Sequence, residues 1–378
     1  MLKTPLPKWS AGFRPIGAAA ICLQAFTALT AAAQVAAATC GTGYAPPFAA
    51  SAPRRDCPEA IPRHYQPRYK GIGYEILDIE SNACFVPDSA YALLDDIVER
   101  TLARLTHAER VGKGMLARDR ALAVSKAMDA TLIEMGFGLY IPTETLSDAL
   151  VSRAPAGHPP AHIEDCDTAS LILLTIAEVL NIQANLVEIT LRSGSQHNYV
   201  CWPLDGQQVD WDTNARDVCE TPAGQPAFQG KAMLRKETLA YAYRLRGGLW
   251  KRRKDYDRAV ADYMTAMRDW PASPAAYNNF AWIVASVEWP ARKSLYAHAL
   301  AAAERAVQLQ DASELSVLTR TDLGNYYDTL ACLQAYAGDF QKAADTERRA
   351  IATSPQTEFE ERLANLIGPD PKDCTSAP

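Results

Sequence analysis

The sequence predicts two folded parts, an α+β domain followed by an all-α solenoid of helical repeats. Residues 167–180 are apolar nearly all round, which is typical of a buried central helix. Three short segments rich in β-branched and aromatic residues follow, which favours an antiparallel sheet packed on that helix. From residue 240 onward, small and aromatic residues recur with a 34-residue period, which indicates stacked helix pairs.

The chain has 378 residues, 48% of them hydrophobic, and a net charge of −6, which predicts a folded protein and argues against nucleic acid as a partner.

The N-terminal segment has the features of an export signal. Before the first acidic residue, Asp56, basic residues precede an uncharged apolar stretch and runs of alanine. This pattern predicts a signal peptide over residues 1–38 and an exported, periplasmic or envelope-associated protein. The alternative is a membrane anchor retained over residues 16–38.

The next segment is rich in proline, and the chain contains several cysteines. Residues 39–68 are rich in proline and lack a periodic apolar pattern, so we expect an extended linker. Nine cysteines less the one in the signal peptide leave eight, an even number that fits disulfide bonds in an exported protein. A bridge among Cys40, Cys57 and Cys84 is plausible, but the sequence does not fix the connectivity.

The α+β domain is expected over residues 69–235. Apolar residues at helical spacing between charges predict amphipathic helices in its first half. The pair Asp205-Gly206 between the last two strands is a strong hairpin signal. The expected helices cover residues 90–105, 118–135, 143–151 and 167–180, and the expected strands cover residues 184–191, 197–202 and 208–211.

The solenoid is expected over residues 236–360, followed by a tail over residues 361–378. Its small positions let two helices approach, and aromatic neighbours fill the gap. The first unit carries Gly247, Trp250, Tyr256, Ala259, Tyr263 and Ala266, and the last carries Gly338, Phe340, Ala343 and Ala350. Residues 277–310 form a third helix pair between them. These positions match the tetratricopeptide repeat. We interpret the aromatic residues Tyr241, Tyr243, Trp250 and Tyr256 as repeat core.

Three residues before the solenoid form a candidate catalytic triad. Cys166 opens the buried helix, where backbone N–H groups and the helix dipole stabilise a thiolate. His197 opens a strand and can accept the thiol proton, and Asp212 at the end of the next strand can orient the imidazole. Asp210 lies on the same strand face as Asp212, so it remains the alternative third member.

At these residues the chain resembles the transglutaminase-like, papain-fold superfamily, in the bacterial branch in which tetratricopeptide repeats follow the domain. The family pattern is a Cys opening a core helix, a His leading a strand with an aromatic residue two places on, and an Asp before a Thr. Here these are Cys166, His197 with Tyr199, and Asp212 with Thr213. The resemblance covers about residues 85 to 220 and implies a Cys-His-Asp hydrolase or acyltransferase, although some relatives have lost activity. A calcium loop and an assignable oxyanion hole are missing from the pattern.

Other interpretations accompany these residues. Cys166 is alternatively an inert buried thiol, and the flanking Asp165 and Asp167 oppose the helix dipole by raising the thiol pKa. His158, His162 and Cys166 are spaced by four, but the prolines between the histidines break a helix, so we expect no metal site. Cys201 is expected to be buried packing or half of a bridge.

The sequence therefore predicts an exported thiol hydrolase or acyltransferase acting on peptide or amide bonds, without a cofactor. Its expected partners are a peptide or protein substrate and a protein bound on the repeat surface; the oligomeric state is left open. The alternative is a non-catalytic envelope scaffold, in which the first domain is a binding module and the repeats bind proteins.

Overall fold

The structure is a computed structural model that describes residues 63–83, 86–139, 145–151, 162–190, 196–204, 207–218, 231–311, 320–369, 371 and 374. The expected signal peptide lies outside these residues, as do the three cysteines considered for a bridge, Cys40, Cys57 and Cys84. Within the described ranges, no helix combines the length and the apolar composition needed to cross a membrane.

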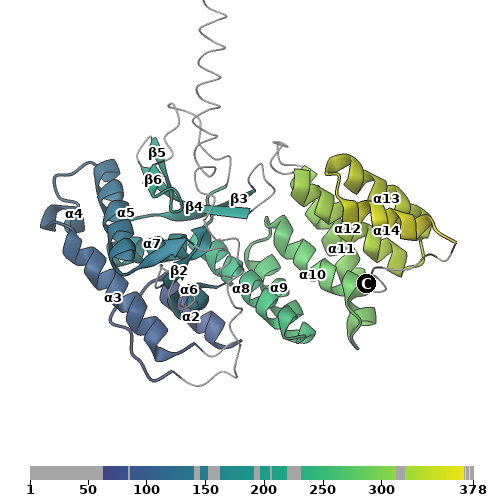
Figure 1. Ribbon diagram of the computed structural model, residues 1–378, viewed down its shortest axis with the longest axis horizontal. Helices are drawn as coiled ribbons and strands as arrows, with labels where there is room; N and C mark the ends of the chain where they lie inside the picture. Colours follow the sequence, from purple (N-terminus) through teal and green to yellow (C-terminus); the bar gives the residue numbers. More distant parts are fainter. Residues whose placement is uncertain are drawn as a thin grey trace, which may run out of the picture.

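Helices form most of the first part of the chain (Figure 1). The predictions for residues 90–105 and 118–135 are confirmed by α3 and α5, and the shorter prediction for residues 143–151 corresponds to α6. Their apolar faces belong to one core that also contains the central helix. These leading helices are α2 (Ile72–Ser81), α3 (Asp88–Arg104), α4 (His107–Val111), α5 (Ala117–Glu134) and α6 (Leu146–Val151).

The predicted buried helix is α7 (Cys166–Val179), and an antiparallel sheet follows it. The strands β3 (Asn185–Thr190), β4 (Gln196–Leu204), β5 (Gln207–Asp212) and β6 (Asp217–Val218) are neighbours in chain order. Val200, Trp202, Val209 and Trp211 share the core of α7, whereas Tyr199 and Cys201 belong to a small cluster on the other face. Successive side chains of β4 thus alternate between the two faces of the sheet.

A second, two-stranded sheet was not predicted. Strand β1 (Phe137–Leu139) pairs in parallel with β2 (His162–Glu164), which leads directly into the start of α7. Each strand has three residues, too few for a periodic pattern to distinguish it from a loop.

The C-terminal part consists of helix pairs that resemble tetratricopeptide repeats (Figure 1). The predicted third pair between residues 277 and 310 is confirmed by α10 and α11. The helices are α8 (Arg235–Arg252), α9 (Tyr256–Asp269), α10 (Pro274–Ser286), α11 (Arg292–Asp311), α12 (Arg320–Tyr336), α13 (Phe340–Thr353) and α14 (Thr357–Ile367). A disulfide joins Cys332 of α12 to Cys374 near the C-terminus.

Helix α8 belongs to both parts of the molecule. Tyr241 and Ala242 lie in the core of α7, while Leu249 and Trp250 lie in the core of the repeats. The predicted domain boundary at residue 235 thus falls at the start of a helix that the two parts share.

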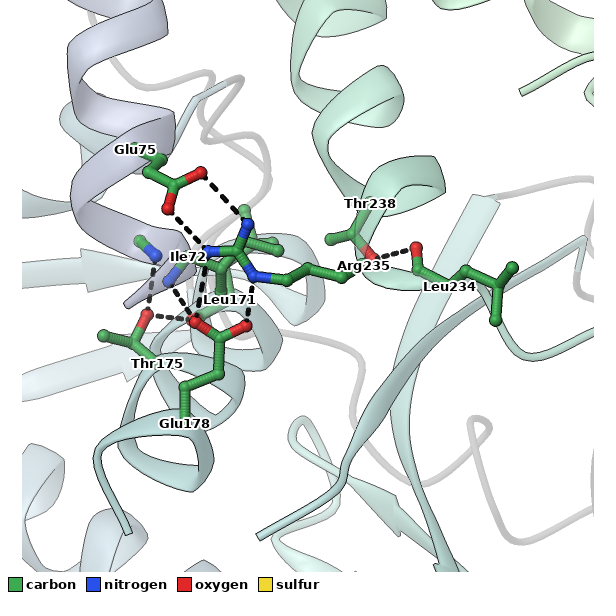
Figure 2. Close-up of polar contacts among 9 residues, drawn as sticks. Ile72, Glu75, Leu171, Thr175, Glu178, Leu234, Arg235 and Thr238 are labelled. Atoms are coloured by element: carbon green, nitrogen blue, oxygen red, sulfur yellow. Dashed lines mark hydrogen bonds and ion pairs between the residues drawn. The ribbon is translucent and has the colours of Figure 1, made fainter. Parts of the chain in front are cut away.

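Charged side chains fix the first turn of α8 against the N-terminal domain. The Arg235 guanidinium bonds to Glu178 of α7 at 2.7 Å and to Glu75 of α2 at 2.6 Å (Figure 2). Glu178 also accepts the backbone N–H of Ile72 at the start of α2, at 2.7 Å. One guanidinium therefore connects three helices at this junction.

Candidate functional site

The site is built around the N-terminal end of α7. Asp165 caps the helix: its Oδ1 accepts the N–H of Thr168 at 2.9 Å, and the Thr168 hydroxyl accepts the N–H of Asp165 at 3.0 Å. This reciprocal capping box fixes where the helix begins. Cys166 is the first helical residue, half-buried, and its thiol is not in a disulfide.

The thiol is held in its neutral form. Burial raises the pKa of Cys166 well above its ordinary value, and the charges of Asp167 and Asp165 raise it further, against a lowering by the backbone N–H of Asn198. The thiol lies 3.4 Å from Oδ1 of Asp167, to which it donates. The expected opposition between the aspartates and the helix dipole is therefore resolved in favour of the protonated thiol.

The edge of β4 lies next to this thiol. Strand β4 pairs with β5 from Val200 onward, and Asn198 precedes that pairing, so its backbone N–H is directed at Cys166 instead of at β5. The Thr213 hydroxyl, in the turn after β5, donates to the Cys166 carbonyl at 3.4 Å.

His197 and Asp212 are in contact. The Nε2 atom of His197 lies 3.4 Å from Oδ2 of Asp212, and both side chains are buried. The backbone N–H groups of Asn214 and Ala215 donate to the other carboxylate oxygen at 2.9 and 3.2 Å. Burial pushes the pKa of Asp212 upward, but His197 and these two amides outweigh it and hold the pKa below its ordinary value. Asp212 is thus an ionised carboxylate that two backbone amides orient and that faces Nε2 of His197.

Asp210, the alternative third member, has other contacts. It accepts a hydrogen bond from Nε2 of Gln208 at 2.8 Å and lies opposite Cys201 in the strand register. Burial, with the Asp210 charge added, raises the pKa of Cys201 to about 12. Cys201 is buried and not in a disulfide, so of its two expected roles buried packing is confirmed and half of a bridge is not.

Sequence reasoning missed a polar cluster beside the thiol. Nδ2 of Asn198 donates to Oδ1 of Asp167 at 2.7 Å and to the hydroxyl of Tyr241 at 2.8 Å. The Tyr241 hydroxyl donates to Oδ2 of Asp167, also at 2.7 Å. We interpreted Tyr241 as repeat core from its place in the aromatic stripe, and the periodic pattern held no sign of the contact of its hydroxyl with α7.

Two buried acidic side chains lie near Arg216, in the turn after β5. Glu164 of β2 is buried and accepts a hydrogen bond from Arg216 at 2.5 Å. Asp129 of α5 is buried as well, and burial raises its pKa to about 8 against the lowering effect of Arg216. Glu164 of β2 therefore holds Arg216 in that turn.

His162 and Cys166, two of the three residues spaced by four, do not share a helix. His162 lies in β2 and stacks on Phe137 with ring centroids 4.7 Å apart, whereas Cys166 begins α7. His158 lies outside the described residues. In the part of the chain that the structure describes, no group of three or more His, Cys, Asp and Glu side chains is placed to hold a metal ion.

Comparisons with known proteins bear on the repeat region. No family model matches the chain, and no curated protein matches it. Among solved structures, the C-terminal helical repeat region resembles the N-terminal domain of stress-induced protein-1 (STI-1) from C. elegans. The two are 16% identical with a TM-score of 0.30, over 36% of this chain and all of that domain.

Proposed function

We propose that the chain is an exported thiol enzyme that hydrolyses or transfers the acyl group of peptide or amide bonds. Its first part would be a transglutaminase-like, papain-type domain with Cys166, His197 and Asp212 as catalytic residues, and its repeats would bind a protein or peptide partner. The observation that carries the proposal is the contact of 3.4 Å between Nε2 of His197 and Oδ2 of Asp212, in a chain whose helix α7 begins at a cysteine outside any disulfide.

The mechanism follows from the roles of these groups. Nδ1 of His197 takes the proton of the Cys166 thiol as the sulfur attacks the substrate carbonyl. The carbon–nitrogen bond of the amide then breaks, the leaving amine takes that proton from His197, and the acyl group remains on sulfur as a thioester. Water or an acceptor amine, deprotonated by His197, then attacks the thioester carbonyl. The carbon–sulfur bond breaks, the acyl group leaves as a carboxylic acid or a new amide, and the proton on His197 returns to the sulfur to restore the thiol. Asp212 orients the imidazole and stabilises its charged form.

A neutral resting thiol is compatible with this sequence of steps. Because burial and two aspartates raise the pKa of Cys166, the proton leaves the sulfur only when His197 accepts it during attack. The enzyme would thus operate by general-base catalysis and would not store a thiolate. Slow reaction with general thiol reagents is the expected consequence.

Export is part of the proposal and has one structural support. The disulfide between Cys332 and Cys374 belongs to an oxidising compartment, since the reducing cytosol disfavours such bonds. The acid-free, alanine-rich start of the sequence is consistent with delivery to such a compartment.

Acetyl transfer from p-nitrophenyl acetate tests the catalytic proposal. We expect the full chain to release p-nitrophenol and to carry an acetyl group on Cys166, located by peptide mass spectrometry. Cys166→Ala should abolish this labelling, and His197→Ala should slow it by roughly 100-fold or more. Cys201→Ala is the matched control and should behave like the unchanged protein. Equal rates for the unchanged chain and Cys166→Ala would rule the enzyme out.

The second candidate is a non-catalytic envelope scaffold, which the raised pKa of Cys166 favours. In that case the His197–Asp212 contact is structural, and the repeats bind proteins while the first domain serves as a binding module. No acetyl group should then accumulate on Cys166, and Cys166→Ala should leave partner binding unchanged.

A further inference from the structure

Three groups converge on the carboxylate of Asp167. The Cys166 thiol and Nδ2 of Asn198 donate to Oδ1, at 3.4 and 2.7 Å, and the Tyr241 hydroxyl donates to Oδ2 at 2.7 Å. Asn198 and Tyr241 are 1% and 2% exposed, so water does not substitute for them freely. The first helix of the repeats thus reaches the residue next to the candidate nucleophile.

The surroundings of Tyr241 keep its hydroxyl in place and protonated. Arg244, one turn further along α8, lies over the ring with its guanidinium carbon 4.7 Å from the centroid and pairs with Glu188 of β3. Burial raises the pKa of Tyr241 well above its ordinary value, and the charges of Asp167 and Glu188 raise it further. A phenol in this state donates a hydrogen bond to Asp167 across the accessible pH range.

The backbone that carries Tyr241 is fixed as well. Arg235, six positions earlier, holds the start of α8 to Glu178 near the end of α7 (Figure 2). Tyr241 meets Asp167 near the beginning of α7. Helix α8 is therefore tied to both ends of the helix that bears the thiol, which is the arrangement expected of a support that sets geometry.

We propose that Tyr241 is a positioning residue for Cys166, acting through the Asp167 carboxylate, so that the first repeat helix is part of the reactive site. The inference rests on the proposed function in taking Cys166 as the reacting group. By binding Oδ2, Tyr241 keeps the Asp167 carboxylate turned toward α8 and Asn198. Without it, one hydrogen-bond donor fewer offsets the charge of that carboxylate, which then holds the proton of the Cys166 thiol more strongly.

The charged groups around Cys166 and Tyr241 all influence how strongly the thiol holds its proton. Asp165 and Asp167 belong to α7 itself, and His197 with its partner Asp212 comes from the sheet. The pair of Glu188 and Arg244 lies behind Tyr241 and is the same in any variant that changes only the phenol. A substitution that removes only the hydroxyl therefore isolates its effect on Asp167.

The test is the pH profile of Cys166 alkylation by iodoacetamide, followed residue by residue with peptide mass spectrometry. In the full-length chain, Tyr241→Phe should shift the profile upward by roughly half a pH unit to one unit, or slow alkylation about three- to tenfold at a fixed pH on its rising part. Tyr243→Phe is the matched control on the same helix, where the ring packs against Arg246 at 5.0 Å, and should leave the profile unchanged. An unshifted profile in Tyr241→Phe overturns the inference.

A double-mutant cycle separates positioning from general loosening of the fold. Asp167→Asn removes the charge and should shift the profile downward. In that background, Tyr241→Phe should add no further upward shift, because the carboxylate through which it acts is gone. A shift of equal size in both backgrounds would show that Tyr241 acts on Cys166 by another route and would refute the inference.

A second donor keeps the test usable if Tyr241→Phe does not fold. Asn198→Ser removes the other strong donor to Asp167 from a different element and should shift the profile in the same upward direction. Alkylation is a property of the thiol and needs no substrate. If the full-length chain transfers no acetyl group but the expected alkylation shifts are observed, the proposed function alone is wrong. If it transfers acetyl groups but the alkylation shifts are absent, the positioning role alone is wrong.

Discussion

Gly247 of α8 packs directly against the ring of Tyr263 of α9, between the two helices of the first repeat pair. A Cβ atom placed on Gly247 would come within 2.5 Å of Cε1 of the Tyr263 ring, which is 3% exposed. A real Cβ does not approach another atom so closely, so the ring or the helix would have to move. The small residue at this repeat position is therefore required by the approach of the two helices.

Gly247→Ala should destabilise the protein. Forcing a methyl group against a buried ring is overpacking, which costs about 1–3 kcal/mol in free energy of unfolding. Chemical denaturation of the full chain measures the change.

The next residue provides the control for that experiment. Gly248 lies in the same helix, but a Cβ there would meet nothing within 4 Å. Gly248→Ala should stabilise the protein by about 0.5–1 kcal/mol, because alanine restricts the unfolded chain and favours the helix. Equal effects of the two substitutions would mean that the contact with Tyr263 does not limit the packing of this pair.

The repeat signature was predictable because it is local. Gly247 and Tyr263 lie 16 positions apart in two successive helices, so the pattern of small and aromatic residues reports their packing directly. The bond between Tyr241 and Asp167 joins residues 74 positions apart across two predicted domains. Periodicity identified Tyr241 as a core aromatic, but no local pattern indicates the partner of its hydroxyl.

The candidate triad shows a similar division. Helix start, strand and hairpin signals placed Cys166, His197 and the two aspartates, because each signal is confined to a few residues. The period of two in a strand puts Asp210 and Asp212 on one face and cannot separate them. What separates them is the turn after β5, whose backbone amides hold Asp212 while Gln208 holds Asp210.

Asp212→Asn should lower the rate of acetyl transfer to Cys166 by at least about 100-fold, if the proposed function is correct. The amide cannot stabilise the charged imidazole and favours the wrong tautomer of His197, as in other triads. Asp210→Asn, on the same strand face, should stay within a few-fold of the unchanged protein because Asp210 contacts Gln208 and Cys201. Rates from p-nitrophenyl acetate decide between them, and a larger loss in Asp210→Asn would reverse the assignment.

Cys374→Ser should destabilise the C-terminal repeat by breaking the disulfide to Cys332. The bridge spans 42 positions, for which chain entropy gives up to about 4 kcal/mol of stabilisation. Thermal melting should show a lower midpoint, and a reducing agent should lower the midpoint of the unchanged protein by more than that of the variant. A midpoint insensitive to reduction would show that the bridge contributes nothing to stability.

Asp129→Asn should flatten the dependence of stability on pH. Burial raises the folded-state pKa of Asp129 to about 8, whereas an unfolded aspartate has a pKa of about 3.9. Between these values the folded state keeps a proton that the unfolded state has lost, so the stability that Asp129 contributes at low pH falls as the pH rises toward about 8. Each pKa unit corresponds to about 1.4 kcal/mol, so the fall amounts to a few kcal/mol.

Asparagine stays neutral, and the variant should therefore be more stable than the unchanged protein at pH 8 and similar to it at pH 4. Denaturation at several pH values measures this difference. Asp119→Asn, an exposed position on the same helix, is the control and should leave the slope unchanged; an equal slope in Asp129→Asn would show that Asp129 is ionised in the folded protein at neutral pH.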